Sequence, residues 1–195
     1  MTIEGKIGSF SRNEEQARGV GHDPVIMGLL FAAIGILAMG RLVTRAATGL
    51  VAFVVASAEV LATGDGATQV YTGTLANFPL EPGTVSITDG VETFTDDGFG
   101  RLWGDAGGTG TFRYDKGIYA LDFNANVADG TDITSDYVTA IDGVLDEDLD
   151  TAQSSSANCV VHGAVKLDVL KVNNAGDAPS AAVLSLLAKK GIYAS

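Results

Sequence analysis

The chain has 195 residues, of which 46% are hydrophobic, 18% are charged and 25 are glycine. This composition is typical of a turn-rich β protein with a substantial core, and it argues against a disordered chain. The formal net charge of −12, from 24 acidic and 12 basic groups, argues against nucleic-acid binding, because such binding depends on the neutralisation of phosphates.

The first 23 residues are polar and have few large apolar side chains. We expect residues 1–23 to form an extended arm, which is either a terminus without a role or a segment that orders only against a partner. In the second case Ile3, Ile7 and Phe10 would contact the partner while the arm adds a strand to the edge of its sheet.

An uncharged, apolar run follows at residues 25–40 and ends before Arg41. A helix that crosses a membrane needs about 20 such residues, so the run is slightly short for a span. Its glycines favour buried strands with a turn near Gly35 or Gly40. A membrane-spanning helix is the alternative interpretation of this run.

Residues 65–138 have the pattern of an antiparallel β module. In residues 83–95, Asp89-Gly90 predicts a hairpin with a two-residue turn, which would place Val85 opposite Phe94. A second hairpin is expected over residues 110–123 and a last strand over residues 131–137. Strands separated by turn signals at such short intervals indicate a small antiparallel β-sandwich or a barrel.

The side chains of these hairpins and of the acidic segments suggest two kinds of ligand. Trp103 and Tyr119 could supply faces on which a sugar stacks, or they could both be core residues. Two acidic clusters, at residues 142–150 and around Asp96-Asp97 with Asp105, raise the question of calcium. Neither cluster has EF-hand spacing, so solvated acidic loops are favoured and no metal or other cofactor is expected.

The sequence offers little for catalysis, and we expect no enzymatic activity. His162 lies mid-strand and His22 lies in the polar N-terminal region, with no nucleophile and orienting group beside either in a known pattern. The serines at residues 154–156 have no Gly-x-Ser-x-Gly context, and the glycine-rich residues 104–110 lack the lysine and helix of a phosphate loop. Cys159, the one cysteine, is expected to be a small buried hydrophobe.

The C-terminal segment predicts a strand, a linker and one short helix. The strand is expected at residues 158–166. Asp177 is placed to cap the helix, Pro179 suits its first turn, and Gly191 offers a left-handed stop. One apolar stripe faces the core, and it consists of Val183, Leu184 and Leu187.

This strand–linker–helix ending, completed by Gly191-Ile192, resembles the C-terminus of the lambda-type head decoration proteins of tailed bacteriophages. The strand-turn at residues 40–49 is similar to the apolar, Gly-basic-Leu-Val stretch of the same family. Residues 88–98, with Gly104-Asp105, are similar to a β-rich segment that recurs in tailed-phage virion proteins.

The resemblance implies a mainly β fold: a β-tulip-like decoration domain with one short C-terminal helix, interrupted by the small antiparallel β-sandwich. The decoration domain would comprise residues 24–64 and 139–195, and the inserted module residues 65–138. Family members cement the capsid, and their N-terminal arm is implicated in gripping it.

The expected function is therefore that of a capsid decoration protein, made in the host cytoplasm and bound to the outer surface of the virion head. Its expected partners are the major capsid protein and two further copies in a homotrimer, without nucleic acid or membrane. Two alternatives are a tail or surface adhesion protein whose sandwich binds a surface glycan, and a membrane-anchored protein that uses residues 25–40 as its span.

Overall fold

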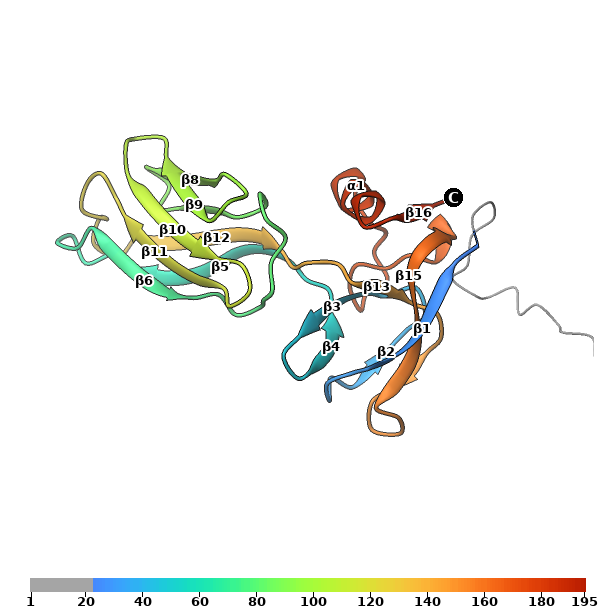
Figure 1. Ribbon diagram of the computed structural model, residues 1–195. Coiled ribbons are helices and arrows are strands. Elements are labelled where there is room, and N and C mark those ends of the chain that lie inside the picture. The colour runs from blue at the N-terminus through green and yellow to red at the C-terminus, as the bar shows by residue number, and fades with distance from the viewer. Residues whose placement is uncertain (1–22) are drawn as a thin grey trace, which may run out of the picture.

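The computed structural model describes residues 23–195 and shows two β-rich lobes joined by two short chain segments (Figure 1). We call the lobe that contains both ends of the described chain the platform, and the other lobe the barrel module. Within residues 23–195 there is one α-helix, α1 (Ala181–Lys189), and one 3-10 turn, η1 (Leu167–Val169). The predicted mainly β fold is confirmed.

The platform is built from chain segments on both sides of the barrel module. Its main sheet has the strand order β1 (Val25–Leu30), β15 (Ser156–Val165), β13 (Gly143–Leu145), β3 (Leu42–Ala46) and β4 (Gly49–Ala52), and β16 (Ile192–Ala194) pairs in parallel with β15. A two-stranded sheet joins β2 (Ile36–Leu37) to β14 (Leu149–Asp150). Strands that are more than 90 residues apart in the sequence therefore form one sheet.

The apolar run at residues 25–40 forms strands, as the first of the two sequence interpretations predicts. Gly35 and Gly40 both have positive φ angles, of 85° and 82°, and they mark turns. A Cβ atom on Gly40 would lie 1.8 Å from the carbonyl oxygen of Val169, so this turn requires glycine. Among residues 23–195, no helix has the length and apolar character needed to cross a bilayer.

The barrel module is a single antiparallel sheet of eight strands. Their order is β5 (Val55–Thr63), β12 (Asp132–Val138), β7 (Ser86–Thr88), β8 (Thr93–Asp96), β9 (Arg101–Gly104), β10 (Thr109–Arg113), β11 (Ile118–Asp122) and β6 (Val70–Thr74). The sheet curls until its two end strands, β5 and β6, approach each other. Curling of this kind leaves little exposed sheet edge.

Two details of the predicted module are wrong. Of the two architectures that the strand spacing indicates, it is the barrel, one nearly closed sheet, and not the inserted sandwich of two stacked sheets, because β12 and β11 extend the run of hairpins at both ends. Its boundary also lies earlier than residue 65. β5 pairs along its length with β12, so residues 55–63 belong to the barrel module and not to the platform.

The first hairpin has a longer loop than predicted. Thr88 pairs with Thr93, so Ile87 and not Val85 lies opposite Phe94. The side chain of Asp89 accepts hydrogen bonds from the N–H groups of residues 91 and 92, at 2.9 and 2.7 Å, and so holds a four-residue loop. The turn is therefore determined by the hydrogen bonds of the Asp89 carboxylate to the following backbone. The Asp-Gly pair by itself does not determine the length of the loop.

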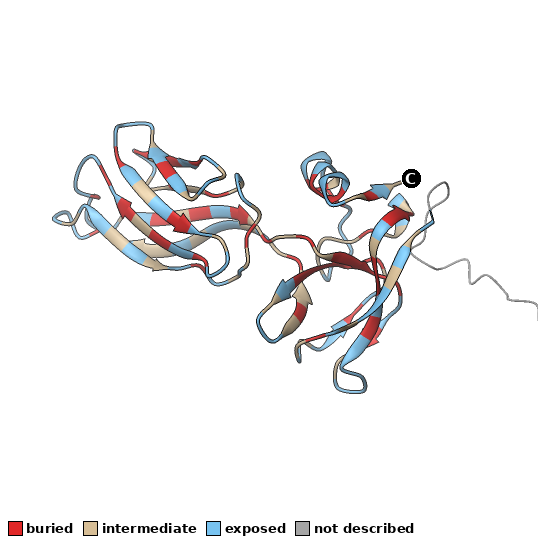
Figure 2. Cartoon of the chain, viewed as in Figure 1, coloured by how far each residue is buried: buried red, intermediate tan, exposed pale blue. Residues whose placement is uncertain are grey.

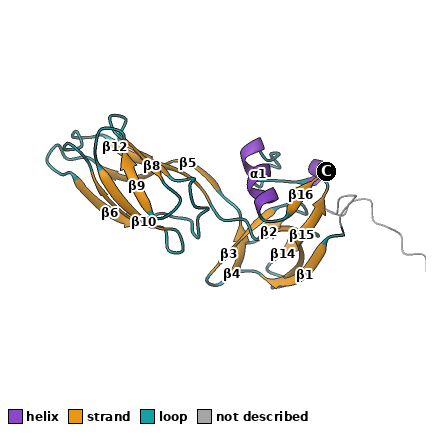
Figure 3. Ribbon diagram, turned by 45° about the horizontal axis from the view of Figure 1, so that its top comes forward, coloured by secondary structure: helices purple, strands orange, loops and turns teal. Residues whose placement is uncertain are grey.

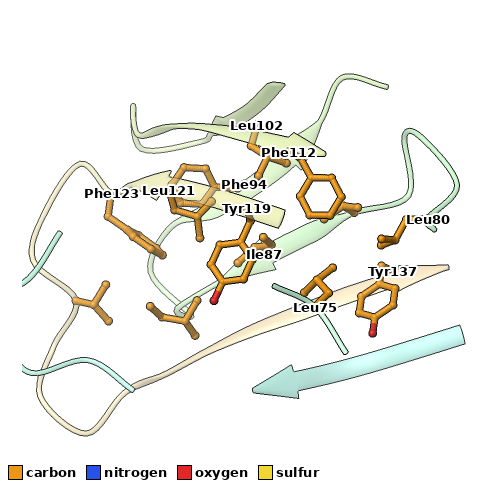
Figure 4. Close-up of a cluster of buried hydrophobic side chains, with 13 residues drawn as sticks. Leu75, Leu80, Ile87, Phe94, Leu102, Phe112, Tyr119, Leu121, Phe123 and Tyr137 are labelled. Carbon is orange, nitrogen blue, oxygen red and sulfur yellow. The ribbon is translucent and has the colours of Figure 1, made fainter. Parts of the chain in front are cut away.

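Each lobe has its own hydrophobic core (Figure 2). In the barrel module alternate residues of the strands point inward, as Tyr119 and Leu121 do in β11 and Ile133 and Tyr137 do in β12. Figure 4 shows aromatic rings from several strands meeting inside the sheet, and Phe94 and Phe123 form an edge-to-face pair with centroids 4.8 Å apart. The buried aromatic residues of this core are Phe94, Phe112, Tyr119, Phe123 and Tyr137.

Helix α1 covers the platform, with Val183, Leu186 and Leu187 buried against it (Figure 3). Its N-cap is Ser180, whose hydroxyl accepts from the N–H of Val183 at 3.4 Å, and not Asp177 as predicted. The predicted stop is present, because Gly191 has a φ of 78° and the chain then enters β16.

The two lobes meet at Thr139, which is 2% exposed and follows β12. Its hydroxyl accepts from the N–H of Val54 at 2.9 Å, and its own N–H donates to the carbonyl of Val54 at 3.0 Å. The same hydroxyl forms a 2.9 Å hydrogen bond with that of Thr44 in β3. An ion pair of 3.7 Å between Lys190, after α1, and Glu81 of the barrel module is a second link between the lobes.

Candidate functional site

Two surfaces of the described chain are candidates for binding, one on each lobe. On the platform, four large apolar side chains of β1 and β2 face solvent. Their exposed fractions are 50% for Val25, 49% for Met27, 68% for Leu30 and 72% for Ile36. Val25 and Met27 lie on one face of β1 and Leu30 on the other, because successive side chains alternate across a strand, and Ile36 lies on β2. Several large exposed apolar side chains in one chain segment are typical of an interaction site. We call these four residues the β1–β2 surface.

The backbone of β1 adds to this surface. Within residues 23–195, β1 pairs with β15 and stands at the end of the strand order, although its continuation at Phe31 forms a parallel bridge to Leu50 of β4, so the open edge is confined to β1 itself. An outer edge strand can accept a further strand from a partner. The predicted arm contacts, Ile3, Ile7 and Phe10, lie outside the described residues and stay predictions. Residue 23, the first described residue, precedes β1 by two positions in the sequence.

The acidic cluster at residues 142–150 stabilises turns of the platform. Asp148 accepts from the N–H of Met39 at 2.7 Å, and Glu147 accepts from the N–H of Asn158 at 2.7 Å. In this acidic loop, carboxylates accept hydrogen bonds from backbone N–H groups of neighbouring segments and so stabilise their conformation. Among residues 23–195, no group of three or more acidic, histidine or cysteine side chains is arranged to hold a metal ion.

The second acidic cluster has a similar structural role. Asp96 is 8% exposed and accepts from the N–H groups of Gly83 and Gly98, at 2.6 and 2.8 Å, and from the hydroxyl of Tyr114. Burial, together with this hydrogen bond, raises the pKa of Tyr114. Asp105 accepts from the N–H of a neighbouring strand residue at 2.9 Å.

Cys159 is fully buried in the platform core, as predicted. Burial, with smaller effects from Asp146 and Glu147, raises the pKa of its thiol to about 12. A thiol in this state is a poor nucleophile at neutral pH. His162 lies at the start of the β1 pairing, opposite Val25, and its side chain packs beside the Gly191 stop.

In the sequence, Arg41 marks the end of the apolar run. The structure places it in the platform interior, 6% exposed, where Nη2 donates to the carbonyl of Phe53 at 3.0 Å. Desolvation lowers the pKa of its guanidinium group. Because Phe53 immediately precedes the connection to the barrel module, this side chain supports the junction between the lobes.

The second candidate surface lies on the barrel module. Only one of the two aromatic residues considered for sugar stacking is available for it. Tyr119 is 3% exposed and belongs to the core, whereas Trp103 is 54% exposed on the outer face. The outward side chains beside Trp103, which are Thr109 on β10 and Asp122 on β11, were not among the predicted ligand-binding residues. Strict alternation with the buried residues of the same strands is the signal that would have placed them on this face.

Searches of family models, of curated proteins and of solved structures found no match to this chain.

Proposed function

We propose that the chain is a capsid decoration protein that binds the outside of an assembled phage head and stabilises the shell against internal pressure. The β1–β2 surface carries this proposal. Its four side chains are apolar and exposed, three of them lie on β1 at the end of the strand order, and β1 follows the predicted capsid-gripping arm in the sequence. We assign this surface, together with the arm, to the contact with the major capsid protein.

Further support comes from the topology of the platform. The two segments that resemble the decoration family, residues 40–49 and the C-terminal strand–helix–strand, pack in the same lobe. The barrel module interrupts that lobe between β4 and β13. An insertion at such a position leaves the platform's own sheet continuous.

The proposed mechanism is mechanical and involves no chemical step. Three copies sit over a threefold junction and bridge neighbouring capsid subunits through apolar and main-chain contacts. A protein that binds the closed lattice, but not the opened one, shifts the equilibrium toward the closed lattice by mass action. The acidic character of the chain, with its net charge of −12, suits an exterior position because like charges keep virions apart.

Binding to expanded, undecorated heads by co-sedimentation tests the proposal. The double variant Leu30→Asp/Ile36→Asp places two charges on the β1–β2 surface and is expected to abolish binding. Val91→Asp is the matched control, because Val91 is 82% exposed on the barrel module, and it is expected to bind as the unaltered chain does. Equal binding by the double variant would refute the assignment of this surface.

A further inference from the structure

A shallow groove of about 380 Å³ lies on the outer face of the barrel module, across β6, β9, β10 and β11. Its floor is low because the outward side chains at its centre, Thr109, Thr111 and Ala120, are short. Arg101 and Trp103 of β9 form one wall. The groove is therefore a consequence of side-chain size on a continuous sheet and does not depend on loops.

The register of the sheet brings the groove's functional groups into one row. Trp103 lies opposite Thr109, Thr109 lies opposite Asp122, and Asp122 lies opposite Val70. Adjacent strands are about 4.8 Å apart, so Trp103 and Asp122 stand roughly 10 Å from each other on the two sides of Thr109. An indole ring and a carboxylate thus face a common space that is floored by a hydroxyl group.

Trp103 contributes nothing to the barrel core, which Phe94, Leu102 and their neighbours fill. Its ring is 54% exposed, and the guanidinium carbon of Arg101 lies 5.4 Å from the ring centroid. This cation–π contact orients the indole on the surface. A large aromatic ring held in place beside polar groups, and left open to solvent, is a recognisable binding element.

We propose that this groove binds a hexopyranose unit of a neutral surface polysaccharide. The apolar C–H face of the sugar ring stacks on the indole of Trp103. The carboxylate of Asp122 accepts hydrogen bonds from adjacent sugar hydroxyls, and the Thr109 hydroxyl and the Arg101 guanidinium group supply further polar contacts. A neutral glycan fits better than a polyanion because the chain carries a net charge of −12.

The position of the groove suits a ligand that approaches from solution. β5 and β12 connect to the platform through Val55 and Val138, which pair at one end of the barrel module. The row of residues from Trp103 to Val70 lies toward the other end of the barrel module. Each of these residues is at or next to the end of its strand that is farther from Val55 and Val138. The site rests on the geometry of the barrel module, and it does not depend on the proposed binding of the capsid.

The full-length chain has a single tryptophan, so intrinsic fluorescence reports directly on the groove. We expect one or more members of a panel of neutral gluco-, galacto-, manno- and rhamno-oligosaccharides to change the emission of Trp103 in a saturable manner. Because Trp103→Ala removes the fluorophore, its affinity is measured by saturation-transfer NMR, and a loss of about tenfold or more is expected. Trp103→Phe retains a stacking face and should keep most of the affinity.

Matched variants separate the groove from general surface effects. Asp122→Asn is expected to weaken binding, whereas Asp115→Asn, in the exposed turn between β10 and β11, should not. Phe99→Ala removes a 92% exposed ring outside the groove and should bind as the unaltered chain does. The proposal is refuted if no member of the panel gives a saturable signal, or if binding survives both Trp103→Ala and Asp122→Asn. Head binding by these variants stays intact in either case, which keeps the two proposals separately testable.

Discussion

Individual polar residues in this chain act mainly on the backbone around them. Glu92, for example, is 3% exposed and accepts from the N–H groups of Gly108 and Asn124, at 2.5 and 2.8 Å. A sequence that contains many acidic residues therefore invites a metal-site hypothesis that its structure does not support. Which carboxylate faces a backbone N–H depends on loop geometry, and neither composition nor spacing reveals it.

The burial of Cys159 was predictable from its apolar strand context, and it has a measurable consequence. Its thiol pKa is raised from 9.0 to about 12, so the folded protein keeps the proton that the unfolded chain loses. The free energy of unfolding should therefore fall as pH rises above about 9, by up to about 1.4 kcal/mol per pH unit for this group. Urea unfolding between about pH 8 and 9.5, below the usual tyrosine pKa of about 10, measures the slope.

Cys159→Ala provides the control for this slope. The variant loses some stability at every pH because it leaves a small cavity, but the part of the pH dependence that belongs to the thiol should disappear. An unchanged slope in the variant would show that other groups cause the effect.

At the scale of the secondary-structure elements, alternation and helical periodicity predicted strand faces well. Phe112, Tyr119 and Leu121 point inward at every second position of their strands, because period-two alternation is a local property of the chain. Registers and caps were harder to predict. The loop at residues 89–92 and the N-cap at Ser180 depend on which side chain reaches a particular N–H group, and several neighbouring residues are chemically able to do so.

The stop after α1 gives a test at this scale. Gly191 has a φ of 78°, and a Cβ atom there would lie 2.6 Å from the ring of His162. Gly191→Ala is therefore expected to add a steric clash to the cost of a left-handed conformation, which is about 1 kcal/mol by itself. Gly176→Ala is the matched control, because Gly176 has a φ of 87° and open space around the Cβ position.

Chemical denaturation compares the two variants. We expect Gly191→Ala to be the less stable one, and we expect Gly176→Ala to show the conformational cost alone. Equal losses of stability would indicate that the contact between Gly191 and His162 does not constrain the chain.

At the scale of the whole molecule, the sequence allowed the joining of distant segments to be anticipated only through family resemblance. The pairing of β5 with β12 was missed because residues 55–63 read equally well as a strand of either lobe. The sequence left a sandwich and a barrel as alternatives for a related reason, since strand patterns do not distinguish two stacked sheets from one curled sheet. Of the groove on the barrel module, the sequence indicated Trp103 alone. Most of the other lining residues come from three further strands, and their positions beside Trp103 depend on the register of the sheet.

The junction between the lobes gives a prediction at this scale. Thr139→Val keeps the side-chain shape but removes the hydroxyl that bonds Val54 and Thr44. Because these groups would be left without that partner in a buried setting, the variant should lose about 1–3 kcal/mol of stability. Urea unfolding measures the loss, and Thr72→Val on the exposed face of β6 is the control. A loss no larger than that of the control would show that the junction does not depend on this hydroxyl.

Imaging of expanded, undecorated heads mixed with the full-length chain tests the central proposal most directly. The proposal predicts added density at the threefold junctions, with the platform against the shell and the barrel module projecting outward. Electron cryomicroscopy at moderate resolution distinguishes the lobes, because two short chain segments connect them. Bare junctions at saturating protein, or a barrel module turned toward the shell, would contradict it.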